Sequence, residues 1–100
     1  MDWYTLTDTE VIAALGGRLR LARMERSLTQ HMLAEKSGLN RATIRDMEQG
    51  KSIQLLSLIA ALRGMDLLES LESLLPGLDD SPVLLHKFGQ RKRVRPSKNR

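Results

Sequence analysis

The chain has 100 residues, no cysteine, only 3% aromatic residues and a formal net charge of +4 at pH 7. This length allows one domain, and the scarcity of aromatic residues disfavours a β-sandwich or barrel. Abundant leucine, alanine, arginine and glutamate favour an all-α protein. Without cysteine there can be no disulfide or thiolate metal site, and no export signal or membrane-spanning stretch is evident. We therefore expect a cytoplasmic protein.

The charge is distributed unevenly along the chain. Residues 91–100 hold six basic side chains and no acid. Residues 1–90 therefore have a net charge of −2, which is the total of +4 minus the 6 charges of the tail. Residues 18–51 contain eight Lys or Arg against four acids, whereas residues 66–80 contain five acids and no base. This asymmetry predicts one pole that faces phosphate and another that does not.

The first helix has a well-specified start. Thr7 and Glu10 have the spacing of a capping box, so the helix should begin at Thr7 or Asp8. An apolar stripe with helical spacing then points to the core: Val11, Ile12, Leu15, Leu19 and Ala22. The pair Gly16-Gly17 weakens a helix, so it either permits close contact with another helix or marks a kink.

Residues 29–52 read as two short helices around a tight turn. Thr29 can cap the first helix, Gly38 suits its left-handed exit, and Asn40 can cap a second helix that runs to Gly50. The positions expected to be buried between them are Leu33, Ala34, Leu39, Ile44 and Met47. The remaining face of the second helix carries arginine and short side chains, which suits the major groove of DNA.

The residues that carry a family resemblance are Leu28-Thr29-Gln30, Leu33-Ala34, Gly38-Leu39, Ile44 and Met47-Glu48-Gln49-Gly50-Lys51. With them, the stretch from about Leu15 to Leu62 resembles the lambda-repressor-like (Cro/repressor, XRE-type) DNA-binding domain. That resemblance implies a five-helix, all-α helix-turn-helix domain, here with a short C-terminal extension. Across the full length the chain is most similar to HipB-type antitoxins, repressors that accompany a HipA-type kinase toxin and repress their own operon.

The resemblance and the chemistry of the side chains together predict the DNA contacts. The candidates for base contact are Arg41, Ala42, Thr43, Arg45 and Asp46, with Arg41 suited to guanine and Thr43 to a thymine methyl or a phosphate. Asp46 could accept from cytosine, pair with Arg45 or hold an arginine in place. The candidates for phosphate contact are Gln30, which lies in the opening turn of its helix, and Gln49, Gly50, Lys51 and Ser52. The family also implies an ion pair between Arg23 and Glu48.

Residues 53–78 are dense in leucine and should form the fourth and fifth helices. One stripe is Leu55, Leu58, Ile59 and Leu62, and a second is Leu67, Leu68, Leu71, Leu74, Leu75 and Leu78. Leu56, Ala60 and Ala61 add apolar surface beyond the first stripe, which suggests an interface. We expect a homodimer on a palindromic operator, with Leu56, Ala60, Leu67, Leu71 and Leu74 in the interface.

These elements divide the chain into three parts. Residues 7–78 should form the DNA-binding and dimerisation domain, and residues 79–90 a linker with one helical turn or a short strand. Residues 91–100 cannot bury apolar surface and should be a disordered basic tail. The tail could serve solubility, non-specific DNA contact or partner binding.

No catalytic constellation can be assembled from the two histidines and the scattered acids, so we expect no enzyme, metal or cofactor. The favoured function is a sequence-specific repressor, the antitoxin of a HipA/HipB-type toxin-antitoxin system, in the bacterial cytoplasm at the nucleoid. A stand-alone phage-type repressor and a restriction-modification controller share the same domain. A protein-interaction module without DNA affinity is the alternative of another class.

Overall fold

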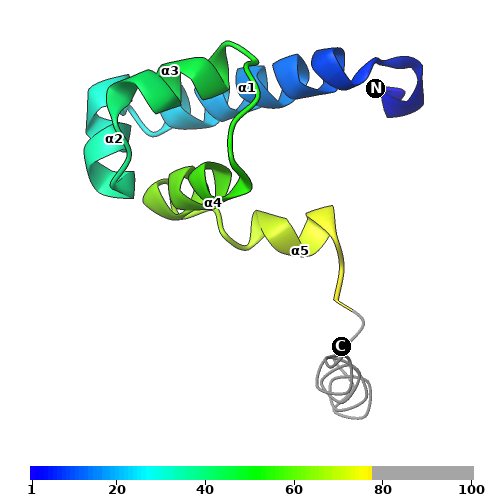
Figure 1. The fold of residues 1–100 in the computed structure, drawn as a ribbon. Coiled ribbons are helices and arrows are strands. Elements are labelled where there is room, and N and C mark those ends of the chain that lie inside the picture. Colours follow the sequence, from blue (N-terminus) through cyan, green and yellow to red (C-terminus); the bar gives the residue numbers. More distant parts are fainter. Residues whose placement is uncertain (78–100) are drawn as a thin grey trace, which may run out of the picture. The chain divides into compact units, whose positions relative to one another are not determined.

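The structure, a computed structural model, describes residues 1–77, which contain helices and no strand (Figure 1). The elements are the 3-10 helix η1 (Trp3–Thr5) and the α-helices α1 (Asp8–Glu25), α2 (Gln30–Ser37), α3 (Arg41–Glu48), α4 (Leu55–Gly64) and α5 (Ser70–Leu74). The predicted all-α, five-helix fold is therefore confirmed. The predicted linker of residues 79–90 and basic tail of residues 91–100 lie outside the described residues, as does Leu78.

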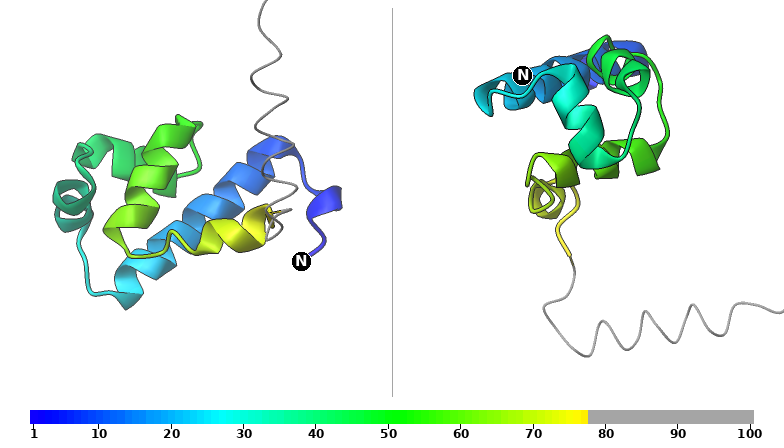
Figure 2. Two further views of the ribbon diagram at one scale, coloured as in Figure 1. Left: turned by 90° about the horizontal axis from the view of Figure 1, so that it is seen from below. Right: turned by 90° about the vertical axis from the view of Figure 1, so that its left-hand side faces the viewer.

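Internal contacts divide the chain into two units after Leu68, so η1 and α1–α4 belong to one unit and α5 to the other. Within the first unit, α3 packs against α1 and α2, and α2 also packs against α4 (Figure 2). These contacts surround a core of six buried residues: Leu33, Ala34, Ile44, Met47, Ala61 and Met65. The core therefore joins both helices of the helix-turn-helix to α4.

The helix boundaries follow local capping signals. The Thr7 hydroxyl accepts from the Glu10 backbone N–H, and the Glu10 carboxylate accepts from the Thr7 backbone N–H, so the predicted capping box is present. The Thr29 side chain accepts from the Met32 backbone N–H and caps α2, and the Asn40 side chain accepts from the Thr43 backbone N–H and caps α3. Gly38 ends α2 with φ = 74°, a left-handed conformation that glycine adopts without steric cost.

Gly16 allows α1 and α3 to approach closely. A Cβ atom at this position would overlap the carbonyl oxygen of Met47 and lie 3.0 Å from that of Glu48. Apart from its chain neighbours and the nearby backbone of α1, no described atom lies within 4 Å of a Cβ placed on Gly17, and α1 continues without a break through both glycines. Close contact therefore accounts for Gly16, and a kink is not needed.

The N-terminal segment contacts α1 through one aromatic ring. Trp3 is partly buried, and the guanidinium carbon of Arg18 lies 4.9 Å from the centre of its ring, within the range of a cation–π contact. The neighbouring Tyr4 is fully exposed. A cation–π contact therefore ties η1 to α1.

The prediction for the leucine-rich region was partly wrong. Ala61, expected to be surplus apolar surface, is 1% exposed in the core, while Leu55 of the expected inward stripe is 67% exposed. Leu67, assigned to the dimer interface, packs against the core of its own chain. The second leucine stripe does not form one long helix, because α5 contains only Ser70–Leu74.

Candidate nucleic-acid interface

Helix α3 buries one face and exposes the other. Ile44 and Met47 are 1% and 4% exposed in the core. The side chains predicted to contact bases lie elsewhere on the helix: Arg41, Ala42 and Arg45 are exposed, and Thr43 and Asp46 are partly exposed. The structure therefore places the five predicted base-contact residues outside the buried face of α3.

The N-cap of α3 also orients a residue of this exposed face. Asn40 Oδ1 accepts from the Thr43 backbone N–H at 2.8 Å and from the Thr43 hydroxyl at 3.0 Å. Because the hydroxyl hydrogen of Thr43 points to Asn40, its methyl group and oxygen lone pairs remain for other contacts. This arrangement favours the thymine-methyl contact over a hydrogen bond donated to phosphate.

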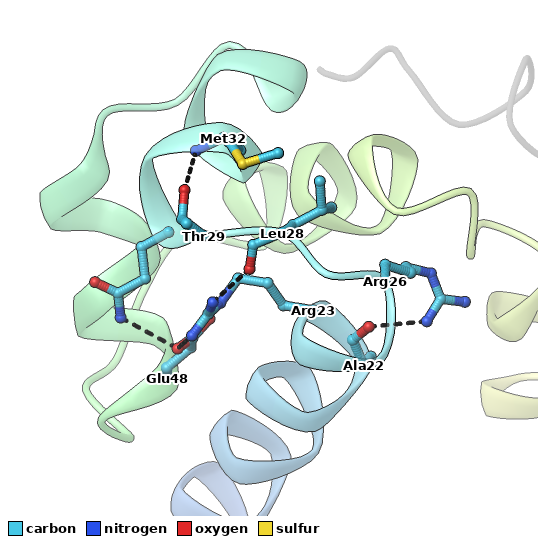
Figure 3. Close-up of polar contacts among 8 residues, drawn as sticks. Ala22, Arg23, Arg26, Leu28, Thr29, Met32 and Glu48 are labelled. Atoms are coloured by element: carbon cyan, nitrogen blue, oxygen red, sulfur yellow. Dashed lines mark hydrogen bonds and ion pairs between the residues drawn. The ribbon is translucent and has the colours of Figure 1, made fainter.

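Arg23 of α1 and Glu48 of α3 form a two-pronged ion pair (Figure 3). Arg23 Nε donates to Glu48 Oε2 at 2.6 Å, and Nη2 donates to Oε1 at 2.9 Å. The two side chains are only 10% and 4% exposed. The structure thus brings together the pair that the resemblance implied.

The same guanidinium extends this contact to the start of α2. Arg23 Nη1 donates to the carbonyl of Leu28 at 2.7 Å, one residue before the Thr29 cap (Figure 3). Hydrogen bonding to Glu48 raises the pKa of Arg23, although burial lowers it, and the Glu48 charge raises it further. A permanently charged Arg23 therefore fixes the relative positions of three helices.

Gln30, in the first turn of α2, also joins this network. Its Nε2 donates to Glu48 Oε1 at 3.2 Å, so the side chain is partly directed to its own protein. The amide has a second N–H, which leaves one donor for a phosphate oxygen. The predicted phosphate contact thus stays a prediction, with Glu48 now setting the direction of the amide.

The loop after α3 is built around a left-handed glycine. Gly50 has φ = 82°, and a Cβ there would lie 2.9 Å from Ala13 Cα of α1. The Lys51 backbone N–H donates to the Asp46 carbonyl at 2.9 Å, which closes the end of the helix. Around this turn, Gln49, Lys51 and Ser52 are exposed, as a phosphate-binding loop requires.

Asp46 is directed toward two cations of its own chain. Its Oδ1 lies 3.8 Å from Arg45 Nε and 3.5 Å from Lys51 Nζ. The contact with Arg45 was one of the predicted alternatives, whereas the contact with Lys51 was missed. The signal was present in the sequence, because a turn at Gly50 brings Lys51 back beside the last turn of α3.

Arg26 binds two backbone carbonyls, one from α1 and one from the residue after α4. Its Nε donates to the Met65 carbonyl at 2.9 Å, and its Nη1 donates to the Ala22 carbonyl at 2.9 Å. Figure 3 shows the second of these contacts. Arg26 therefore links the end of α1 to the residue that follows α4, through backbone acceptors that no sequence pattern reveals.

An apolar groove of about 210 Å³ opens beside this region, between α1, the loop after α3 and α4. It is lined by Ile12, Leu15, Gly16, Leu19, Met47, Lys51, Ser52, Ile53, Gln54, Leu55 and Leu58.

Residues 1–77 contain no group of three or more His, Cys, Asp or Glu side chains placed to hold a metal ion. In the same part of the chain, no helix combines the length and apolar character needed to cross a membrane.

Comparison with known proteins agrees with this geometry. A family model described as helix-turn-helix matches residues 19–67, which run from the second half of α1 to the residues after α4. No curated protein sequence matches the chain significantly. Residues 19–67 are therefore a helix-turn-helix domain of the lambda-repressor-like (XRE) type, a domain that binds DNA in transcription regulators.

Proposed function

We propose that the protein is a sequence-specific transcriptional repressor in which α3 enters the major groove of its operator. The observation that carries this proposal is the exposed face of α3. The opposite face of this helix is held by the core and by the Arg23–Glu48 pair. A rigid helix with Arg41 in its first turn can place a guanidinium against guanine O6 and N7. Ala42, Thr43 and Arg45 then lie along the same surface.

Phosphate contacts from both sides of α3 would set its register in the groove. Gln30 lies at the start of α2, where free backbone N–H groups and the helix dipole favour an anion. Gln49, Gly50, Lys51 and Ser52 form the turn at the other end of α3. Clamps at both ends position a helix without reading sequence, so specificity remains with the side chains of α3.

Replacing Arg41 by alanine should weaken operator binding by roughly 1–3 kcal/mol and relax the preference at one base position of each half-site. The reason is the loss of a two-pronged contact to one base, with the phosphate clamps unchanged. Titration of the variant against the operator, single-base variants of it and random DNA measures both effects. Arg63→Ala, which removes an equal charge at an exposed position in the last turn of α4, is the matched control. Equal loss on random DNA would place Arg41 among the phosphate contacts instead.

Exposed leucines support a homodimer. Leu56 in α4 is 72% exposed and Leu74 in α5 is 62% exposed, and Ala60 and Leu71 are only partly buried. We propose these four residues as the interface; Leu67, also predicted there, is partly buried against the core of its own chain. A twofold dimer would present two copies of α3 to a palindromic operator.

Sedimentation at micromolar concentration should therefore report about twice the chain mass of 11.3 kDa. Leu56→Glu and Leu74→Glu should shift the protein toward the monomer, because a buried unpaired carboxylate opposes association. Leu21→Glu in α1, at a leucine that is also exposed, serves as the control and should leave the dimer intact. A monomer that binds the operator with full affinity would exclude this interface.

The biological role that we propose is the antitoxin of a HipA/HipB-type system, which acts at the nucleoid in the bacterial cytoplasm. The resemblance to HipB-type antitoxins supports a partnership with a HipA-type kinase toxin, and so do the exposed Leu55 and Leu75, which the proposed dimer interface does not use. The adjacent open reading frame tests this role. A kinase-like product that is toxic alone and neutralised by this chain supports it, and an endonuclease or integrase neighbour contradicts it.

A further inference from the structure

Asp46 places a negative charge on the face of α3 that is assigned to DNA. Its neighbours are two cations of the same face, Arg45 in α3 and Lys51 in the following loop, whose side chains are 54% and 61% exposed. One carboxylate oxygen, Oδ1, faces both of them, at 3.8 Å and 3.5 Å. A carboxylate in this position would repel the DNA phosphates, so its presence on this face calls for an explanation.

The environment of Oδ1 favours positions of both cations close to it. This oxygen is shielded from solvent and accepts no hydrogen bond from any described residue. A shielded carboxylate oxygen without a hydrogen bond is unfavourable unless positive charge compensates it. Arg45 and Lys51 supply that charge, so the position of Asp46 keeps both side chains close to it.

We infer that Asp46 determines specificity by holding Arg45 and Lys51 and by repelling phosphate, so that it favours operator DNA over random DNA. The inference rests on the proposed DNA-binding function and extends it to how the protein discriminates. Asp46 acts here as a positioning residue, because its shielded oxygen Oδ1 faces Arg45 and Lys51 of its own chain.

Random and operator DNA respond differently to this charge. Binding to random DNA depends almost entirely on phosphate contacts, so a carboxylate that neutralises Lys51 and repels phosphate weakens it directly. Binding to the operator also uses base contacts, and a nearby carboxylate attracts the Arg45 guanidinium to one side of α3, which limits the directions in which it can meet a base. The carboxylate therefore lowers the affinity for random DNA more than the affinity for the operator.

The test compares Asp46→Asn with wild type on operator and random duplexes at several salt concentrations. Affinity for random DNA should rise by up to about fivefold, the value of a surface ion pair. Its slope of log affinity against log salt should steepen by about one per chain as Lys51 becomes free to contact phosphate. Operator affinity should stay level or fall, so the ratio of operator to random affinity should drop by up to about fivefold, and by more where operator affinity also falls.

Two further variants separate this role from general charge and from folding. Glu35→Gln removes the same charge from an exposed carboxylate on α2, and it should leave the ratio unchanged. Asp46→Glu retains the charge, and it should keep random binding as weak as in wild type. Equal changes in Asp46→Asn and Glu35→Gln, or equal random binding by Asp46→Asn and Asp46→Glu, would overturn the inference. Failure of the wild type to bind any DNA would instead remove the proposed function.

Discussion

Replacing Glu48 by alanine should lower the free energy of unfolding by about 3–5 kcal/mol, because it leaves the buried Arg23 guanidinium without its counter-charge. Three hydrogen bonds end on Glu48, two from Arg23 and one from Gln30. Each of these donors comes from a different helix than Glu48, so their loss also loosens α1 and α2 against α3. Urea unfolding followed by circular dichroism measures the change.

Two other variants show whether burial is the cause. Glu25→Ala removes an exposed carboxylate that lies 4.0 Å from Arg26, and the free energy of unfolding should change by less than about 0.5 kcal/mol. The double variant Arg23→Met/Glu48→Leu removes both charges and should recover much of the stability, because apolar side chains can replace a buried pair. A loss below about 1 kcal/mol in Glu48→Ala would mean that water solvates Arg23 readily.

Adding a single methyl group at Gly16 should also have a large effect on the stability of the fold. Gly16→Ala should lower the free energy of unfolding by about 1–3 kcal/mol, because the new Cβ meets the backbone carbonyls of Met47 and Glu48, which cannot move as a side chain does. Separating α1 from α3 to relieve this overlap would also stretch the Arg23–Glu48 pair. Thermal and urea unfolding of the variant provide the measurement.

The neighbouring glycine offers a matched control. No atom lies within 4 Å of a Cβ on Gly17, so Gly17→Ala should stabilise α1 by up to about 1 kcal/mol through helix propensity. The two substitutions are chemically identical and one residue apart, so opposite signs isolate the contact with α3. The same sign in both would mean that α1 can shift away from α3 without cost.

The parts of the fold that could be predicted from sequence depend on neighbouring residues. The capping box of Thr7 and Glu10, the Thr29 and Asn40 caps and the left-handed Gly38 involve atoms within a few residues, and all are present. The face of α3 was also predictable, because few of its residues are apolar and these define one direction clearly. Local chemistry and a strong hydrophobic pattern are sufficient at these positions.

The parts that were missed depend on contacts between distant residues. In α4, most residues are apolar, so periodicity could not show that Ala61 faces the core and Leu55 faces solvent. Gly16 was compatible with a kink or a contact until the position of Met47 was known. Arg26 binds backbone carbonyls, which every residue has, so its partner Met65 left no signal in the sequence.

The capped turn between α2 and α3 has a consequence for the speed of recognition. Gly38 and Asn40 fix the ends of the two helices, and Ile44 anchors α3 in the core before any ligand arrives. Ordering a recognition element during an encounter slows association and consumes part of the binding free energy. Here that ordering is complete when the chain has folded, so under the proposed function α3 needs no further ordering when the protein meets DNA. The rate of capture should then be governed by diffusion and charge rather than by a conformational step.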